Sequence, residues 1–175
     1  VIMDPQFIPG LTQLVERFGC RGGITIEITE NVFFGDYDRL NAILSELRRF
    51  DIECSIDDFG TGHSSLARLR QLPVAELKID RSFVMDMMRS KDDAVIVKST
   101  IDLAQNLGLR VVAEGVENVQ TLQQLYRLRC DIVQGHHIAR ALPVAELEHF
   151  LAHSKWAVAR LGESAPSEQA GDWTI

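Results

Sequence analysis

The 175-residue sequence lacks any apolar run long enough to cross a bilayer, and it is poor in cysteine and in positive charge. Its three cysteines, Cys20, Cys54 and Cys130, are widely separated and odd in number, and they show neither a disulfide framework nor metal-ligand spacing. We interpret them as buried small hydrophobes in a reducing cytosol. The net charge of −7 argues against a general DNA or RNA surface, although a cation could still mediate phosphate binding.

Short apolar segments alternate with longer segments of helical period along the chain. Gly108 is a good helix C-terminal breaker, Asn118 can cap the helix that follows it, and Pro143 suits the first turn of the last helix. A domain is expected over residues 1–155, followed by a polar, disordered tail over residues 156–175. The expected strands are residues 23–28, 52–56, 76–79, 109–113 and 131–134, and the expected helices are residues 9–18, 40–50, 64–72, 93–107, 122–128 and 143–151.

This strict alternation predicts a parallel sheet with right-handed crossovers. An open doubly wound sheet and part of a closed barrel both fit the pattern, but no glycine-rich dinucleotide fingerprint follows any of the strands, which weakens the first interpretation. A closed barrel needs about eight strands. We therefore predict an α/β fold, a partial TIM-like (β/α) barrel of about five C-terminal βα units with the N-terminal units missing. The start at Val1 agrees with a piece of a longer chain.

Polar side chains stand at the C-terminal ends of all the predicted strands. In a β/α barrel these ends converge on one face, where active sites are built. Crowded carboxylates repel one another and take up protons unless a cation compensates their charge. Hard oxygen ligands favour Mg²⁺, Mn²⁺ or Ca²⁺, so the sequence predicts more than one divalent ion. The residues concerned are Glu27, Glu30, Asp57, Asp58, Lys78, Asp80, Glu114, Glu117 and Gln134.

A simpler interpretation applies to any one of these acids, which can cap a helix or lie as a solvated charge in a loop. It suits Glu30 and Glu117 best. It is weaker for the pair Asp57-Asp58, which directly follows an apolar strand and precedes the glycine loop that begins at Phe59. Chance explains the recurrence at successive strand ends poorly.

The motifs that carry these residues resemble those of the EAL domain family, in the family's order over about residues 1–153. The segment 26–30, Ile-Glu-Ile-Thr-Glu, resembles the family's Glu-Leu-Thr-Glu, and the segment 57–65, Asp-Asp-Phe-Gly-Thr-Gly-His-Ser-Ser, resembles its signature loop. Leu-Lys-Ile-Asp at 77–80, Ala-Glu-Gly-Val-Glu at 113–117 and Gln-Gly at 134–135 continue the match.

The resemblance implies hydrolysis of cyclic di-GMP to linear pGpG with two ions of Mg²⁺ or Mn²⁺, a reaction of bacterial second-messenger signalling. It implies that Asp57 bridges the metals while Asp58 and Glu27 each bind one. Glu114 binds metal or acts as general base. The resemblance also implies that Lys78 orients the attacking water and that Glu117 and Gln134 support the metal–water network. It places Asp80 beside that network and implies that Glu30 anchors the glycine loop.

The chain departs from the family pattern at several positions. The Glu-Ala-Leu motif and a metal-binding Asn are absent, because the chain begins downstream of the motif and Val1 falls near the place of the Asn. The loop Tyr is His63, and the Tyr after Gln-Gly is His136. Adjacent histidines on one strand point to opposite faces, so we assign no ligand role to His136 and His137.

Three function classes follow from the sequence. The first is an active phosphodiesterase, the second is a catalytically inactive cyclic di-GMP receptor, and the third is an unrelated metal-dependent barrel enzyme of aldolase or enolase type. The resemblance also implies a cytoplasmic location, with membrane anchoring through upstream segments left open. A homodimer and attachment to sensory or GGDEF-type domains are expected, and DNA or RNA binding is not.

Overall fold

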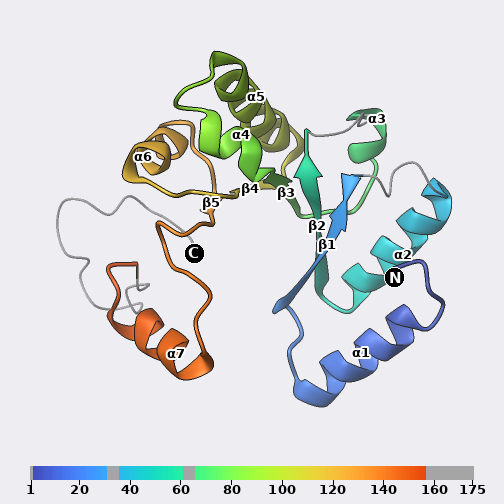
Figure 1. The fold of residues 1–175 in the computed structure, drawn as a ribbon. Coiled ribbons are helices and arrows are strands. Elements are labelled where there is room, and N and C mark those ends of the chain that lie inside the picture. Colours follow the sequence, from blue (N-terminus) through green and yellow to red (C-terminus); the bar gives the residue numbers. More distant parts are fainter. Residues whose placement is uncertain (1, 31–35, 61–65, 157–175) are drawn as a thin grey trace.

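Five strands form one parallel sheet in the computed structural model, which describes residues 2–30, 36–60 and 66–156 (Figure 1). The strands lie side by side in sequence order, and every neighbouring pair is parallel. Sequential addition of strands is the order of a barrel, whereas a doubly wound sheet reverses its strand order. The α/β prediction and the partial barrel are confirmed. The strands are β1 (Ile24–Thr29), β2 (Ile52–Phe59), β3 (Glu76–Ile79), β4 (Arg110–Ala113) and β5 (Ile132–Val133).

The helices follow the strands as expected, with one addition. A short helix directly after β3 has no counterpart in the predicted pattern; its N-cap is Asp80, which accepts a hydrogen bond from the backbone of Ser82. Asn118 caps its helix through Thr121 N, and Gly108 ends the longest helix with a φ of 73°. The helices are α1 (Phe7–Phe18), α2 (Tyr37–Arg49), α3 (Leu66–Leu69), α4 (Arg81–Asp86), α5 (Lys91–Leu107), α6 (Val119–Arg127) and α7 (Val144–His153).

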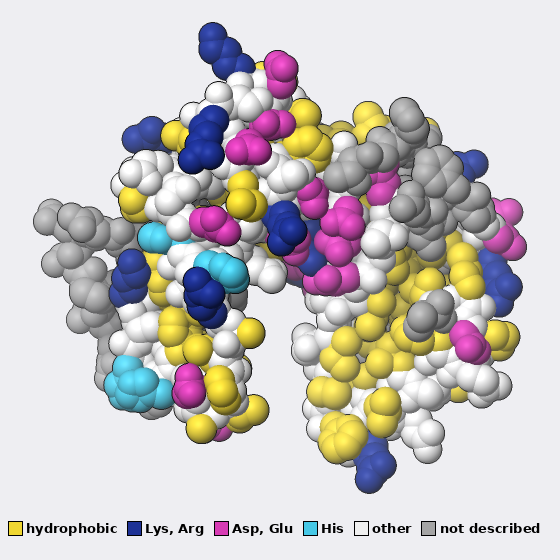
Figure 2. All heavy atoms as spheres, viewed as in Figure 1, with side chains coloured by type: hydrophobic (Ala, Val, Ile, Leu, Met, Phe, Trp, Pro, Cys, Tyr) yellow, Lys and Arg dark blue, Asp and Glu magenta, His cyan; other side chains and the backbone are white. Residues whose placement is uncertain are grey.

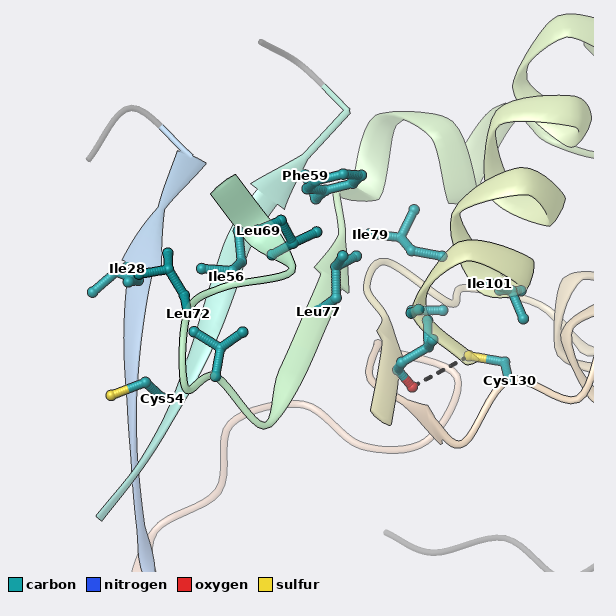
Figure 3. Close-up of a cluster of buried hydrophobic side chains, with 14 of the residues drawn as sticks. Ile28, Cys54, Ile56, Phe59, Leu69, Leu72, Leu77, Ile79, Ile101 and Cys130 are labelled. Atoms are coloured by element: carbon teal, nitrogen blue, oxygen red, sulfur yellow. Dashed lines mark hydrogen bonds between the residues drawn. The ribbon is translucent and has the colours of Figure 1, made fainter. Parts of the chain in front are cut away.

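The two faces of the sheet differ in character. Alternate residues such as Ile28, Ile56 and Leu77 are buried in the hydrophobic core that the close-up in Figure 3 shows. The other alternate set, on the opposite face, is polar on β1, β2 and β3 and apolar at Val112 on β4 and Ile132 on β5. The pairings Thr25 with Glu53, Glu27 with Ser55 and Glu76 with Arg110 lie on it. In a barrel this second face lines the interior, so the functional groups lie inside the partial barrel.

The cysteines behave largely as the sequence predicts. All three are free; Cys54 and Cys130 are buried and Cys20 is half-buried. Burial raises the pKa of Cys54 to about 11 and that of Cys130 to about 12, which makes both thiols poor nucleophiles. Cys130 lies two residues before β5, and its Sγ donates to Val111 O at 3.6 Å, the dashed line in Figure 3.

Two expectations concern parts of the chain beyond the core. The tail predicted over residues 156–175 lies, except for Trp156, outside the described residues and stays a prediction. No helix within the described ranges has both the length and the apolarity needed to cross a bilayer.

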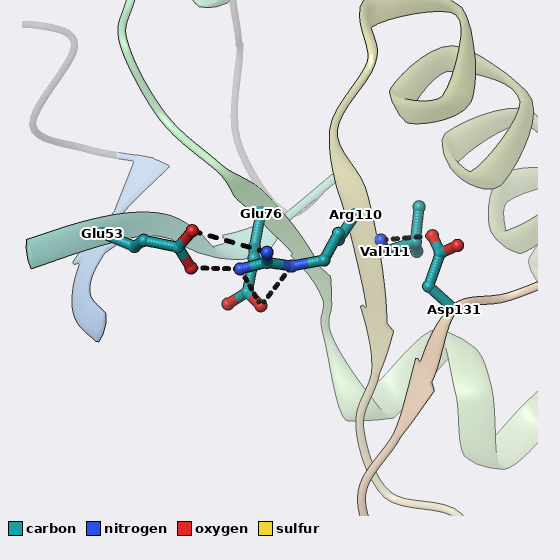
Figure 4. A network of polar contacts seen from close by, with 5 residues as sticks. All are labelled: Glu53, Glu76, Arg110, Val111 and Asp131. Carbon is teal, nitrogen blue, oxygen red and sulfur yellow. Dashed lines mark hydrogen bonds and ion pairs between the residues drawn. The ribbon is translucent and has the colours of Figure 1, made fainter. Parts of the chain in front are cut away.

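An ion network joins the N-terminal ends of three strands. The Arg110 guanidinium on β4 bonds to Glu53 on β2 and lies 3.0 Å from Oε2 of Glu76 on β3 (Figure 4). Asp131 accepts from Val111 N at 2.8 Å beside this network. These hydrogen bonds, to Glu53 first, hold the pKa of Arg110 above its usual value. Because active sites of β/α barrels lie at the opposite ends of the strands, we assign this network to stability.

Replacing Arg110 by methionine should lower the free energy of unfolding by about 1–2 kcal/mol, because it leaves the Glu76 carboxylate, 12% exposed, without its cation. The exposure of Arg110 and Glu53 keeps the loss modest. Urea denaturation measures it, and Lys98→Met, which removes an exposed pair with Asp102 one turn away on α5, should cost less than about 0.5 kcal/mol. Equal losses in the two variants would contradict a role for the network beyond that of a surface pair.

Candidate active site

Lys78 is the centre of a cluster at the carboxyl ends of the strands. Its side chain is buried, and Nζ lies 2.6 Å from Oε1 of Glu27, 2.7 Å from Oε1 of Glu114 and 3.3 Å from Oδ1 of Asp57. The four residues come from β3, β1, the residue after β4, and β2. The face drawn in Figure 2 has acidic side chains gathered beside basic ones near its centre. The structure thus brings together four residues that the sequence places far apart.

The charge state of Lys78 follows from its neighbours. Burial alone would lower its pKa, but the hydrogen bonds to Glu114 and Glu27 and the negative charges of Glu114 and Asp57 outweigh burial and raise the pKa well above its usual range. Lys78 is therefore an ammonium, and its single positive charge faces three carboxylates. The cluster keeps an excess of negative charge.

Asp57 and Asp58 lie within β2, which continues to Phe59, three residues beyond the predicted strand end. The register with β3 shifts between Ile56 and Phe59, and Asp58 has a φ of 54°. In a regular strand the two neighbouring side chains would point to opposite faces. The irregularity lets Asp58 face Asp80 while Asp57 contacts Lys78.

Asp58 and Asp80 form a second acidic pair beside the cluster. Burial, followed by the charges of Asp57 and Asp80, raises the pKa of Asp58. Burial acts in the same sense on Asp80, but hydrogen bonds from the side chain and backbone of Ser82 outweigh it and lower the pKa of Asp80. Asp58 is therefore the member that takes up a proton first, as expected for crowded carboxylates.

Glu30, directly after β1, is 3% exposed, so the interpretation as a solvated loop charge is wrong for this residue. Its Oε2 accepts a hydrogen bond from Gly60 N at 3.2 Å, at the start of the glycine loop. Residues 31–35 and 61–65, including His63, lie outside the described residues. The described contact links the end of β1 to the residue after β2.

Two predicted residues do not join the Lys78 cluster. Glu117 and Gln134 follow β4 and β5, but both are exposed, and their side chains make no hydrogen bond or ion pair within the described parts of the chain. The premise for the histidines is wrong: β5 ends at Val133, so His136 and His137 lie in a turn and not on a strand. His137 instead packs edge-on against Trp156, with ring centroids 6.1 Å apart.

Glycines play a role that the sequence reasoning missed. The backbone of Val116 is held between the loops after β4 and β5, because its N–H donates to Gln134 O at 3.0 Å and its carbonyl accepts from His137 N at 2.9 Å. A Cβ on Gly135 would lie 2.7 Å from the carbonyl carbon of Val116 and closer still to its nitrogen and oxygen. Gly115 has a φ of 75°. The sequence signal for this close packing was the glycine that directly follows each polar residue, in Glu114-Gly115 and Gln134-Gly135.

The carboxylates suit a hard divalent cation by donor type. Asp57 Oδ1 is buried and accepts no hydrogen bond from the described residues, and its contact with Lys78 Nζ is a 3.3 Å ion pair, which leaves it capacity for a further ligand. Among the described residues, however, no three Asp, Glu, His or Cys side chains are arranged around a single ion position. The Lys78 ammonium lies where three of the carboxylates meet.

The fold and this cluster define a β/α-barrel protein with a carboxylate-rich site at the carboxyl ends of its strands. The family model described as EAL domain matches residues 1–141, and the chain belongs to the EAL domain family. This membership removes the unrelated aldolase- or enolase-type enzyme as an alternative.

Named relatives agree with this assignment. The chain is 48% identical over 128 residues to the cyclic di-GMP phosphodiesterase NbdA of Pseudomonas aeruginosa. The matched region covers 73% of this chain and 16% of NbdA. The chain is 42% identical over 124 residues to the bifunctional diguanylate cyclase/cyclic di-GMP phosphodiesterase MucR of the same species, covering 71% of this chain and 18% of MucR. The chain thus spans less than a fifth of the length of these relatives.

The fold is also found among solved structures. The PaMucR phosphodiesterase in its c-di-GMP complex superimposes with a TM-score of 0.80 at 36% identity, over 83% of this chain and 60% of that one. The sheet and helices described above are therefore those of an EAL domain.

Proposed function

We propose that the protein containing this chain hydrolyses cyclic di-GMP to linear pGpG with divalent metal ions. The observation that carries the proposal is the cluster in which Glu27, Asp57 and Glu114 surround Lys78. Similarity to NbdA and MucR, both named as cyclic di-GMP phosphodiesterases, supports the substrate. The receptor alternative is less favoured, because the acidic and lysine positions of the family pattern that this chain covers are all filled.

The residues that would hold Mg²⁺ or Mn²⁺ in this proposal are Glu27, Asp57, Asp58 and Glu114. When bound, such ions lower the pKa of a water ligand and offset charge on the phosphoryl oxygens. Carboxylate oxygens from separate strands suit these hard cations.

The chain's own residues perform the remaining steps. Glu114 accepts the proton of the attacking water at its carboxylate, or holds metal there, and Lys78 orients the water as a point charge. Glu30 holds the start of the glycine loop through Gly60 N. Glu117 and Gln134 are proposed to support the metal–water network, and Asp80 positions Asp58 beside it.

We also propose a homodimer, a cytoplasmic location and attachment to sensory or GGDEF-type domains. The bifunctional name of MucR supports a cyclase domain in the same polypeptide. The net charge of −7 supports the absence of a DNA or RNA partner.

The test is product formation by the intact protein. With Mg²⁺ or Mn²⁺ it should convert cyclic di-GMP to pGpG, and chelation of the metal should stop turnover. Ca²⁺ should support binding without turnover, because it is larger and activates water less well. Chromatography of the nucleotides measures the product. Tight binding without pGpG under Mg²⁺ and Mn²⁺ would favour the receptor alternative instead.

A further inference from the structure

The Lys78 ammonium occupies the point at which three carboxylates converge. Its N–O distances of 2.6 and 2.7 Å to Glu27 and Glu114 are those of strong charge-assisted hydrogen bonds. The residue is 5% exposed, whereas the Glu27 side chain is 54% exposed. The ammonium therefore lies deepest in the cluster, and solvent reaches the carboxylates from the outside.

A divalent cation would bind the same three carboxylate groups. Mg²⁺ binds carboxylate oxygens at about 2.0–2.1 Å, and the three carboxylates do not surround one ion position among the described residues, so they would have to close around an ion that lies near Nζ. Two cations at that separation repel strongly where water is scarce. Each carboxylate has two oxygens, and Lys78 uses Oε1 of Glu27 and of Glu114, so the ammonium and the ion could share a carboxylate only against this repulsion.

We propose that Lys78 is a built-in competitor of the divalent cation: it holds Glu27, Asp57 and Glu114 together without metal, and it gives up these carboxylates when metal binds. The proposal rests on the metal-dependent part of the proposed function. Release would also free the ammonium to contact water or a phosphate. Lys78 is thus a positioning residue in the metal-free protein, and it sets the metal concentration at which the site loads.

The charges make this exchange feasible. Three carboxylates against one ammonium leave two negative charges, which is the charge that one divalent ion neutralises. The metal-free cluster therefore still attracts the ion despite the lysine. The same balance distinguishes competition from simple support: removal of a competitor strengthens metal binding, whereas removal of a support weakens it.

Lys78→Met in the intact protein tests the direction of the effect. Binding of Mn²⁺, measured without nucleotide by titration calorimetry or by the electron paramagnetic resonance of free Mn²⁺, should become tighter by about tenfold, because strong hydrogen bonds no longer have to break. The matched control Lys98→Met removes an exposed lysine on α5 and should leave the affinity unchanged. Equal or weaker Mn²⁺ binding by Lys78→Met would overturn the competition.

A measurement on the unaltered protein covers the case in which Lys78→Met does not fold. The buried, hydrogen-bonded ammonium should give a slowly exchanging ¹H–¹⁵N signal without metal, and saturation with Mg²⁺ should shift or remove it. A signal that stays unchanged at saturation overturns the inference alone. Absence of any Mn²⁺ or Mg²⁺ binding would overturn both this inference and the metal requirement of the proposed function.

Discussion

Replacing Glu114 by glutamine should lower the turnover of cyclic di-GMP by about 10²–10⁴-fold, the range expected when a general acid–base group is lost. In the unaltered protein Lys78 Nζ lies 2.7 Å from Oε1 of Glu114. Glutamine keeps the size of Glu114 and an oxygen that can accept this hydrogen bond. What it removes is the negative charge that takes a proton from the attacking water. The loss should therefore fall on turnover at saturating substrate, while much of the ligand affinity remains.

Glu30→Ala provides the contrast, because Glu30 contacts Gly60 N and is not one of the ligands proposed for the metals. Its loss should loosen the start of the glycine loop and weaken metal or substrate binding more than it slows the chemical step. Turnover at saturating substrate and nucleotide affinity, measured for both variants, separate the two roles. If Glu114→Gln hydrolyses at near-parent rates, the active site does not lie at the end of β4.

The positions of most site residues followed from the sequence because strand–helix alternation leaves few topologies. Once the strands are parallel and added in order, Glu27, Lys78 and Glu114 must approach one another, whatever the details of packing. The identity of the central residue did not follow from this argument. The central position of Lys78 among the acids depends on the register between β1, β2 and β3 and on burial of its long side chain.

Features that depend on local backbone conformation could not be predicted. The register shift in β2 and the left-handed Asp58 leave no pattern in the sequence, because an aspartate in a strand is equally compatible with regular geometry. Helix α4 is too short for hydrophobic periodicity to show, and its start is set by the Asp80 cap. The turn at His136 follows from β5 ending at Val133, and strand ends are the least certain feature of any periodic pattern.

The close approach of Gly135 to Val116 leads to the second large expected effect. Gly135→Ala should lower the free energy of unfolding by about 3 kcal/mol or more, because the new methyl group meets backbone atoms and not the end of a flexible side chain. Val116 is fully buried and is hydrogen-bonded to Gln134 and His137, so it cannot move aside without losing these bonds.

Thermal and urea unfolding measure the loss, with Gly10→Ala as the matched control. Gly10 lies in α1, and a Cβ there would meet nothing within 4 Å, so this substitution should stabilise the helix by roughly 0.5–1 kcal/mol. The two glycine substitutions should therefore have opposite signs. Because Glu114 precedes Val116 by two residues, Gly135→Ala protein that still folds should also lose turnover, through displacement of the carboxylate from Lys78. A Gly135→Ala protein as stable and as active as the Gly10→Ala control would show that the loops after β4 and β5 do not hold Glu114 in place.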